Sequence, residues 1–514
     1  MTDCSPLLLG LDCSTSASKA IVFDLMGNEV ARGSQPLALS TPRPGWHEQP
    51  AGDWWQSTVL AIRQAVTQVD TNCVRALAIA HQRETFVPLD EHDEPLCDGI
   101  LWMDERAGDQ LAALEKAFGR EEFHRLTGKR LSMNLTLTKI AWLHQHRPEI
   151  FSKTRKYTDV HAYLVQKLTG EFATGWGCAD PTGMFDLQTR DWCAPLLDEV
   201  GIQREQLPTL AAPGTIIGHV SASAAQSCGL PPGLPVVAGI GDGQASSLGV
   251  NITAPGEASL SLGTSVISGT AIDHYVYSPA FRSMTAGIRD TYLLETVLLG
   301  GTYTLNWFLE KMAARPGQDK ATLQTYYDQA AEHIPAGSLG LVVLPYWNSV
   351  LGPYWDPATS GVILGWRGVH QLEHLYRAIL EGIAFEQHLG TLGVEEALGQ
   401  PVKRYIAMGG GAHSRLWRQI IADVTSKPVH QAETAEATAL GAAILAASGA
   451  GLFTNAQQAA AQMARVNPQA VEPDPARHLL YQQLFEEVYR PLYPAVKGPL
   501  NRLAALSDQL EKSE

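Results

Sequence analysis

The chain has 514 residues, of which 45% are hydrophobic, and its formal net charge is -15 at pH 7. This length favours two or three domains, each with its own buried core. The acidic balance argues against nucleic acid or an anionic membrane as the main partner, so a phosphate ligand would need positive charge supplied locally.

The seven cysteines lie at positions 4, 13, 73, 97, 178, 193 and 228 and form no C-x-x-C pair. A disulfide framework or a zinc site is therefore not expected, and a reducing cytoplasm fits best. The N-terminus has an acidic residue where a signal peptide would be positive, and no segment approaches the roughly 20 apolar residues of a membrane span. We expect a cytoplasmic protein without a membrane partner.

Residues 7–24, LLLGLDCSTSASKAIVFD, predict a hairpin of two apolar strands with a tip of small hydroxyl residues. Ser14, Thr15 and Ser16 form this tip, and Asp12 and Lys19 flank it. Hydroxyls, N–H groups, a cation and a carboxylate at one tip suit a phosphate accompanied by Mg²⁺. An ordinary Ser/Thr turn is the alternative, because these residues also favour turns through local hydrogen bonds.

The next segments predict an α/β domain with an antiparallel start and later parallel strands. A third strand from Glu29 to Leu39 completes a meander, and Asp53 is predicted to cap a helix. A buried strand at 74–80 ends in a polar cluster that includes Arg83 and Glu84, and Trp102 and Asp104 follow. Paired charges and an aromatic wall suit a polyhydroxylated substrate, although a surface ion-pair cluster is the alternative.

A second buried strand, VVAGI at 236–240, leads into Gly241-Asp242-Gly243 and then a predicted helix. Asp242 is interpreted either as the N-cap of this helix or as a general base for a hydroxyl that attacks phosphorus, and the two roles can coexist.

Beyond a predicted hinge at 249–256, residues 258–272, ASLSLGTSVISGTAI, repeat the pattern of the first hairpin. Gly263, Thr264 and Ser265 form the second tip. The repetition suggests a duplication, and hence two related halves with a cleft between them, unless the pattern is coincidental.

Three further stretches of the second half complete the prediction. Gly301 precedes a helix, and the irregular stretch 344–361 is either a packed functional loop or a connector. A strand at 405–408 leads to Gly410, Gly411 and a helix from Ser414, where the backbone can approach an anionic ligand closely. The pattern does not fit G-x-G-x-x-G, so the sequence gives only weak support for dinucleotide binding. The tail at 476–493 predicts an amphipathic helix.

In combination, these motifs resemble the FGGY carbohydrate kinases over nearly the whole chain. GLDCSTSASK and SLGTS are similar to the two phosphate loops of that family, GDG to the segment of its catalytic aspartate, and GGGAHS to its adenosine-binding turn. Thr136, Lys139 and Trp142 match the first family signature. GVILGWRGVHQLEHLYRAILE matches the second, except that Trp366 replaces an aliphatic residue.

The resemblance implies two ribonuclease-H-like, actin-like ATPase domains with a cleft between them: residues 1–250 for the sugar and residues 251–514 for ATP. It implies Asp242 as general base, Asp12 as the organiser of Mg²⁺, and substrate contacts from Arg83, Glu84, Trp102, Asp104 and Asp242. The residues expected to bind ATP are Ser14, Thr15, Ser16, Lys19, Gly263, Thr264, Ser265, Gly301, Gly410, Gly411 and Ser414. Ser14 departs from the family, whose commoner loop has glycine there.

The substrate indications conflict. Gln82-Arg83-Glu84 and PYWDP at 353–357 resemble glycerol kinase. SLGTS and LWMDER resemble xylulokinase, and Asn134 stands where glycerol kinase has a tyrosine. We predict ATP-dependent conversion of D-xylulose to D-xylulose 5-phosphate, with glycerol or another polyol or ketose as the alternative substrate.

Two other classes remain as rivals, an actin-like ATPase that acts on no sugar and a nicotinamide-dependent dehydrogenase. The expected partners are a small-molecule sugar or polyol and ATP, and a homodimer is kept as an option.

Overall fold

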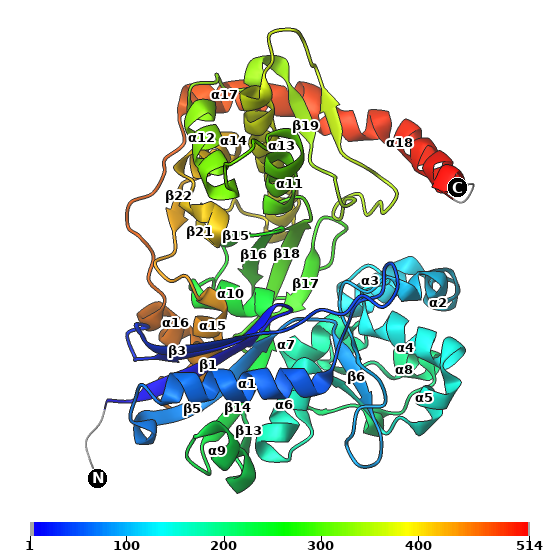
Figure 1. Ribbon diagram of the computed structural model, residues 1–514, viewed down its shortest axis with the longest axis vertical. Helices are drawn as coiled ribbons and strands as arrows, with labels where there is room; N and C mark the ends of the chain where they lie inside the picture. The colour runs from blue at the N-terminus through cyan, green and yellow to red at the C-terminus, as the bar shows by residue number, and fades with distance from the viewer. Residues whose placement is uncertain (1–4, 512–514) are drawn as a thin grey trace.

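The structure is a computed structural model that describes residues 5–511. Two six-stranded mixed sheets form the centres of two α/β domains, with the first domain below the second in Figure 1. The first sheet has the order β13-β14-β5-β1-β2-β3. Its strands are β1 (Leu7–Cys13), β2 (Ala17–Phe23), β3 (Glu29–Pro36), β5 (Val74–His81), β13 (Ile216–His219) and β14 (Pro235–Gly241).

The second sheet repeats this arrangement with the order β17-β18-β16-β15-β21-β22. Its strands are β15 (Glu257–Leu262), β16 (Val266–Ile272), β17 (Arg282–Thr285), β18 (Tyr292–Leu298), β21 (Arg404–Met408) and β22 (Val429–Gln431). In each sheet the opening hairpin extends antiparallel to a third strand on one side and parallel to two strands on the other. The predicted meander, parallel strands and internal repeat are confirmed.

Smaller sheets flank the two large ones. A four-stranded sheet of the first domain contains β4 (Glu48–Gln49), β7 (Gly99–Ile100), β6 (Phe86–Leu89) and β8 (Lys156–Asp159). Two-stranded pairs are β10 (Phe185–Asp186) with β11 (Asp191–Trp192), β9 (Ala173–Gly175) with β12 (Thr209–Ala211), and β19 (Val342–Leu344) with β20 (Val362–Leu364).

The helices of the first half are α1 (Ala51–Val66), α2 (Leu111–Phe118), α3 (Arg120–Thr127), α4 (Thr136–His146), α5 (Pro148–Lys153), α6 (Val160–Thr169), α7 (Trp176–Ala179), α8 (Ala194–Val200), α9 (Ala222–Cys228) and α10 (Asp242–Gly249). The prediction that Asp53 caps α1 is wrong. The cap residue is Pro50, and Asp53 lies in the first turn, where its carboxylate still interacts favourably with the helix dipole.

The helices of the second half are α11 (Thr302–Trp307), α12 (Lys320–Glu332), α13 (Leu372–Leu398), α14 (Arg415–Thr425), α15 (Ala437–Gly449), α16 (Ala456–Met463), α17 (Pro475–Leu484) and α18 (Arg490–Glu511). The predicted end of the tail helix at Tyr493 is wrong, because α18 continues through Pro494 and Pro499. Figure 1 shows α18 projecting away from the second domain.

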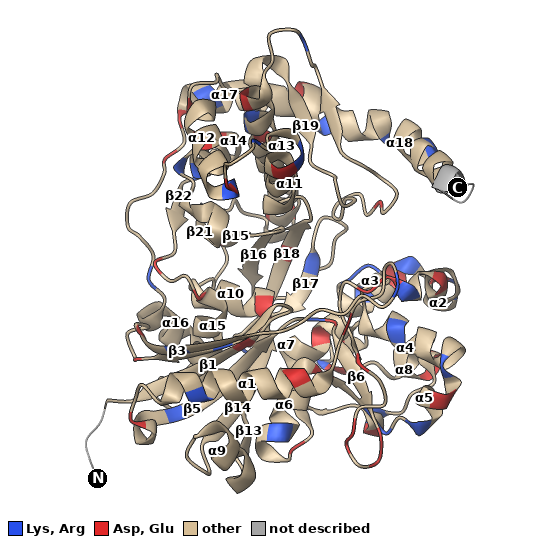
Figure 2. Ribbon diagram, in the orientation of Figure 1, with Lys and Arg blue, Asp and Glu red and all other residues tan. Residues whose placement is uncertain are grey.

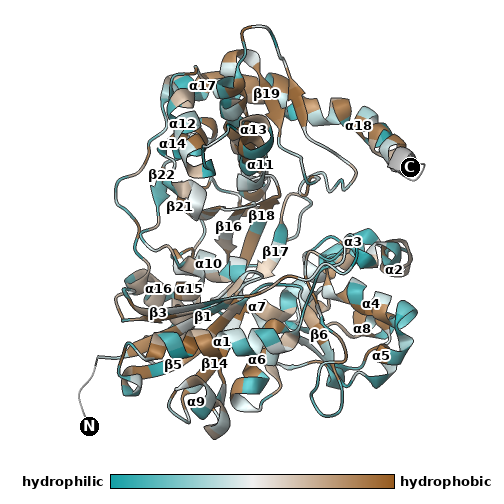
Figure 3. Ribbon diagram, in the orientation of Figure 1, coloured by the Kyte–Doolittle hydropathy of each residue, from teal (hydrophilic) through white to brown (hydrophobic). Residues whose placement is uncertain are grey.

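Two helices of the second half pack against the first sheet. Apolar side chains of α15 and α16 share a buried cluster with Leu8, Ile21 and Phe23 of β1 and β2. The approach is close at Gly10, where a Cβ atom would lie 2.0 Å from the carbonyl oxygen of Ala439. Figure 3 shows the hydrophobic strands of the first sheet between these helices and α1. The core of the first domain therefore includes chain from beyond residue 250.

No helix within residues 5–511 combines the length and the apolar character needed to cross a membrane. Five described cysteines are free thiols, namely Cys13, Cys97, Cys178, Cys193 and Cys228.

Candidate active site

The carboxyl ends of three parallel strands place the predicted catalytic groups together. Asp12 near the end of β1 pairs with Ala80 of β5, and Gly241 at the end of β14 pairs with His81 of β5. The polar cluster that begins after His81 and the carboxylate of Asp242 therefore meet at one edge of the first sheet, where ligands of α/β folds usually bind.

Asp242 is the first residue of α10, and the cap position belongs to Gly241, so the interpretation of Asp242 as the N-cap is wrong. Its Oδ1 atom accepts a hydrogen bond from the Gly243 N–H (2.8 Å) and forms an ion pair with Arg83 Nε (3.0 Å). The side chain is 41% exposed. A substrate hydroxyl can therefore reach this carboxylate while Arg83 fixes its orientation.

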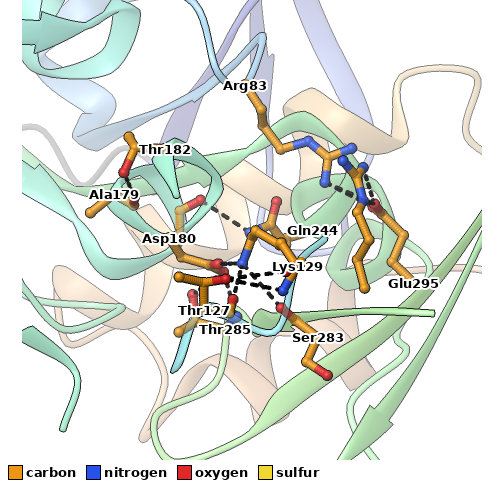
Figure 4. A network of polar contacts seen from close by, with 12 residues as sticks. Arg83, Thr127, Lys129, Ala179, Asp180, Thr182, Gln244, Ser283, Thr285 and Glu295 are labelled. Atoms are coloured by element: carbon orange, nitrogen blue, oxygen red, sulfur yellow. Dashed lines mark hydrogen bonds and ion pairs between the residues drawn. The ribbon is translucent and has the colours of Figure 1, made fainter. Parts of the chain in front are cut away.

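Arg83 begins a chain of ion pairs that crosses from the first domain to the second. Its Nη1 atom donates to both carboxylate oxygens of Glu295 in β18, at 2.9 and 3.1 Å. Arg282 in β17 donates to Glu295 (3.1 Å) and to Glu84 (3.2 Å). Figure 4 shows Arg83 facing Glu295, and Figure 2 shows the charged residues where α10 faces β17.

These ion pairs are buried, which contradicts the alternative of a surface cluster. Arg83 and Glu84 are each 7% exposed, and Glu295 is 1% exposed. Burial alone would raise the pKa of Glu295, but Arg83 and Arg282 lower it to about 2. Glu295 is therefore an anion throughout the neutral pH range.

Trp102 is hydrogen-bonded to the tip of the first hairpin. Its indole Nε1 donates to Thr15 Oγ1 (3.0 Å), and this hydroxyl donates to Gln82 Oε1 (3.0 Å). The hydroxyl of Thr15 thus connects the aromatic wall of the predicted sugar site to the end of β5. A phosphate contact of Thr15 stays a prediction.

Asp104 has no exposed surface. It accepts hydrogen bonds from the His47 N–H (2.6 Å) and from Nε of Arg106 (2.7 Å). The Arg106 guanidinium in turn lies 3.8 Å from the centre of the Trp46 ring. The Asp104 carboxylate is therefore occupied by structural hydrogen bonds, whereas the sequence predicted that it contacts the substrate.

The signature residues Thr136 and Lys139 hold the backbone at Glu84, whose φ of 58° is in the left-handed region. The Glu84 carbonyl accepts hydrogen bonds from Thr136 Oγ1 (3.1 Å) and Lys139 Nζ (3.2 Å). Lys139 also donates to the Leu101 carbonyl (2.6 Å), and burial lowers its pKa to about 7. These contacts stabilise an unfavourable backbone conformation and so direct Glu84 towards Arg282.

Asp12 has the properties of an incomplete cation site. Its Oδ1 atom is buried and has no hydrogen-bond partner. Burial, followed by the neighbouring Asp242 and Glu436, raises its pKa to about 7 against the opposite effect of Lys19. Lys19 itself pairs with Glu436 (2.8 Å). Buried polar atoms rarely lack a partner, so this oxygen fits Mg²⁺.

The described residues contain no group of three or more His, Cys, Asp or Glu side chains that could hold a metal by themselves. This agrees with the usual binding of Mg²⁺, which takes one or two carboxylates and completes its shell with water and substrate phosphates.

The second hairpin tip is held through its backbone. The carbonyls of Gly263 and Thr264 accept hydrogen bonds from the N–H groups of Thr302 (2.8 Å) and Tyr303 (3.2 Å). A Cβ atom at Gly301 would lie 2.7 Å from the Gly263 carbonyl oxygen, so only glycine allows this approach. Among the described residues, the hydroxyls of Thr264 and Ser265 make no hydrogen bond, so they are available to a ligand.

The glycine turn after β21 lies beside this second tip. A Cβ atom at Gly409 would lie 3.2 Å from the carbonyl oxygen of Leu262, whereas one at Gly410 would meet nothing within 4 Å. Gly411 packs against Trp417, and Ser414 caps α14 by accepting a hydrogen bond from the Trp417 N–H (3.2 Å). The structure therefore brings the predicted nucleotide residues of the second domain together.

Sequence reasoning missed the partners that β17 and β18 supply. Glu295 is a single charge within the apolar run YLLETVLL, which was an available signal. A second junction pairs buried Lys129 with buried Asp180. Lys129 also donates to the Ser283 carbonyl (3.1 Å), and Asp180 accepts from the Thr285 N–H (2.7 Å), as Figure 4 shows.

The loop 344–361 also approaches these partners. Leu351, Gly352 and Trp355 line a small pocket together with Arg282 and Glu295. This position favours the prediction of a packed functional loop over that of a connector.

Comparisons with known proteins agree with this geometry. The model of the N-terminal domain of the FGGY family of carbohydrate kinases matches residues 7–249, and that of the C-terminal domain matches residues 258–450. A gluconokinase of Bacillus subtilis is 30% identical over 85% of this chain and 86% of its own. A xylulose kinase of Escherichia coli is 30% identical over 95% of this chain and 99% of its own.

The solved structure of a ligand-bound xylulose kinase from Lactobacillus acidophilus superimposes with a TM-score of 0.90 at 25% identity, over 97% of this chain and all of that chain. The two domains thus have the arrangement of the actin-like ATPase fold. From the matched domains and these relatives, we conclude that the chain is a carbohydrate kinase and belongs to the FGGY family.

Proposed function

We propose that this kinase transfers the γ-phosphoryl group of ATP to a hydroxyl of a small neutral sugar, with D-xylulose as the first candidate and D-xylulose 5-phosphate as the product. The observation that carries this proposal is the open carboxylate of Asp242, which Arg83 orients at 3.0 Å where the two domains meet. Asp242 accepts the proton of the sugar hydroxyl as its oxygen attacks phosphorus.

The sugar binds mainly to the first domain, residues 1–250, between this base and the wall of Trp102. Arg83 and Glu84 contact its hydroxyl groups, because both lie in the ion-pair chain that ends at Asp242. Asp104 holds Arg106, whose guanidinium lies over the Trp46 ring. Closure of the domains would exclude water, which could otherwise accept the phosphoryl group.

ATP binds mainly to the second domain, residues 251–514. Its contacts come from the two hairpin tips, from Gly301, and from the turn of Gly410, Gly411 and Ser414. Asp12 would hold Mg²⁺, because its buried Oδ1 atom has no other partner. When bound, Mg²⁺ neutralises charge on the phosphates.

The pairing of the guanidinium groups favours a neutral sugar over an acid sugar. Arg83 pairs with the carboxylates of Asp242 and Glu295, and Arg282 pairs with those of Glu295 and Glu84. The two guanidiniums face three carboxylates, so the carboxylate of gluconate, the acid named by one group of relatives, would meet an excess of negative charge there. A glycerol kinase, or a kinase of another polyol or ketose, remains the second candidate because the same residues suit any small polyol.

A coupled assay of ATP consumption tests the proposal with D-xylulose, other ketopentoses, polyols, glycerol and gluconate as acceptors. We expect the highest kcat/KM with D-xylulose and the lowest with gluconate. Preference for gluconate would contradict the neutral-sugar argument, and ATP consumption that is indifferent to every acceptor would contradict the sugar-kinase assignment. The homodimer stays a prediction, which light scattering of the purified protein would test.

A further inference from the structure

We propose that Glu295, a residue of the second domain, is a positioning residue for the base of the first domain and acts on Asp242 through Arg83. The proposal rests on the proposed function, because it assumes that Asp242 accepts the proton of the sugar. It assigns to the second domain a part in assembling the acceptor site that is separate from nucleotide binding.

The geometry of the Arg83 guanidinium carries the first step. Nε faces Asp242 (3.0 Å), and Nη1 faces both oxygens of Glu295 (2.9 and 3.1 Å). A guanidinium is planar, so fixing Nη1 also fixes the direction of Nε. Glu295 therefore determines where Arg83 holds the carboxylate of Asp242.

Charge balance carries the second step. Without Glu295, the nearest remaining partner of Arg83 is Asp242, and a free guanidinium binds a carboxylate with two parallel hydrogen bonds. Such a bidentate pair would occupy both oxygens of the base and compete with the sugar hydroxyl. With Glu295 in place, the ion pair of Arg83 with Asp242 runs from Nε to Oδ1 (3.0 Å).

The glycines on both sides of Asp242 independently indicate that this contact is built into the site. A Cβ atom at Gly243 would lie 2.6 Å from Oε2 of Glu295, and one at Gly241 would lie 2.6 Å from the Arg83 side chain. Both glycines have ordinary negative φ, since neither is among the positive-φ residues. Glycine is therefore needed at both positions because a side chain would collide with Arg83 or Glu295, and not because of the backbone conformation.

Glu295 is anchored firmly enough for this role. It lies in the middle of β18, where it pairs with Gly269 of β16 and Arg282 of β17. Arg282 also donates to this carboxylate, with its Nε atom 3.1 Å from Oε1. The acceptor site is therefore complete only when the second sheet is in contact with the first domain.

The test compares Glu295→Gln with Glu295→Asp and with the matched control Glu257→Gln, which removes the partner of Arg404 in a half-exposed ion pair of the same sheet. For each protein, kcat and KM for D-xylulose, or for the best acceptor of the screen, are measured together with the Kd of MgADP by calorimetry. We expect Glu295→Gln to lower kcat/KM for the sugar at least about 30-fold, mostly through kcat, while the Kd of MgADP changes less than about 2-fold.

Glu295→Asp keeps the charge on a shorter side chain, so we expect it to recover part of the lost kcat, and Glu257→Gln to behave as the wild type. A Gly243→Ala variant displaces Glu295 without removing any charge, so we expect the same loss of kcat as in Glu295→Gln. It tests the proposal independently if Glu295→Gln does not fold. Equal losses in sugar turnover and MgADP binding would overturn the proposal in favour of a purely structural role. Unchanged kcat in Glu295→Gln or Gly243→Ala would also overturn it. A wild-type protein that phosphorylates no sugar would instead contradict the proposed function.

Discussion

The two hairpins have the same place in their sheets but differ in what their tips offer. In the first, the Thr15 hydroxyl is hydrogen-bonded to Trp102 and Gln82, and Asp12 lies three residues before Thr15. In the second, Ser261 stands at the corresponding position, and the hydroxyls of Thr264 and Ser265 are free among the described residues. In the proposed function, one tip is connected to the sugar site and to the cation ligand, and the other is available for phosphate alone.

This difference shows how a duplicated unit can serve two substrates. The backbone of the hairpin is retained in both domains, and in the proposed function each tip presents N–H groups to phosphate. The side chains then specialise. We propose that the first tip couples the phosphate site to the acceptor. The second tip is held by the backbone of α11, which leaves its side chains uncommitted.

Replacement of Asp12, the proposed cation ligand, should give the largest difference between the two hairpins. Asp12→Asn removes a carboxylate that has no counterpart in the second hairpin. We expect kcat to fall by about 100-fold or more, which is the usual effect of losing one electrostatic contact to a transferring group. Steady-state assays at several Mg²⁺ concentrations measure it. Ser261→Ala is the control and should change kcat less than 3-fold, as expected for a surface-like polar substitution. Equal effects of the two variants would contradict the asymmetry.

The pH dependence of metal binding should be the next largest effect. Because the pKa of Asp12 is raised to about 7, the carboxylate is charged above this pH and protonated below it. The apparent affinity for Mg²⁺ in the presence of ADP should therefore be highest above pH 7 and decline by up to about 10-fold for each pH unit below it. Calorimetry between pH 5.5 and 8.5 would measure this, and an affinity independent of pH would exclude Asp12 as the ligand.

Alanine substitutions at the two threonines should separate the two substrates. Thr15→Ala removes the hydrogen bond to Trp102, so we expect KM for the sugar to rise by roughly 5-fold, which corresponds to about 1 kcal/mol. Thr264→Ala should raise KM for ATP by a similar factor and leave KM for the sugar unchanged. If both variants changed KM for the sugar and KM for ATP in the same way, the two tips would have the same role, which would contradict the proposed difference.

The smallest effect concerns the backbone that supports the second tip. A methyl group at Gly301 meets the carbonyl of Gly263 at 2.7 Å, whereas one at Gly410 meets nothing within 4 Å. We expect Gly301→Ala to raise KM for ATP a few-fold by displacing the tip, within the usual cost of overpacking. Gly410→Ala would leave the protein as stable as the wild type by thermal unfolding. If Gly410→Ala keeps this stability but weakens ATP binding, the added methyl group must meet the nucleotide, so Gly410 lies against it.

Local patterns were sufficient to predict the two hairpins, the strand before Asp242 and the helix after it. They failed where packing or distant partners decide the outcome. The cap of α1 was predicted at Asp53 but is Pro50, and α18 continues past two prolines where the prediction ended the helix. Arg83 and Glu84 could be chosen from sequence, but Glu295 and Arg282 could not, because ion pairs between residues about 200 positions apart leave no local pattern. A single Glu in an apolar strand was the one available sign.

The most direct test of the account is sugar-dependent ADP formation by Asp242→Asn, measured beside MgADP binding to the same protein. The substitution keeps the shape of the side chain and removes the proton acceptor, so we expect kcat to fall by about 1,000-fold, within the range for a general base. MgADP should bind within about 2-fold of the wild-type Kd, because Asp242 belongs to the acceptor side of the site. Turnover within a few-fold of the wild type would contradict the assignment of Asp242 as the base.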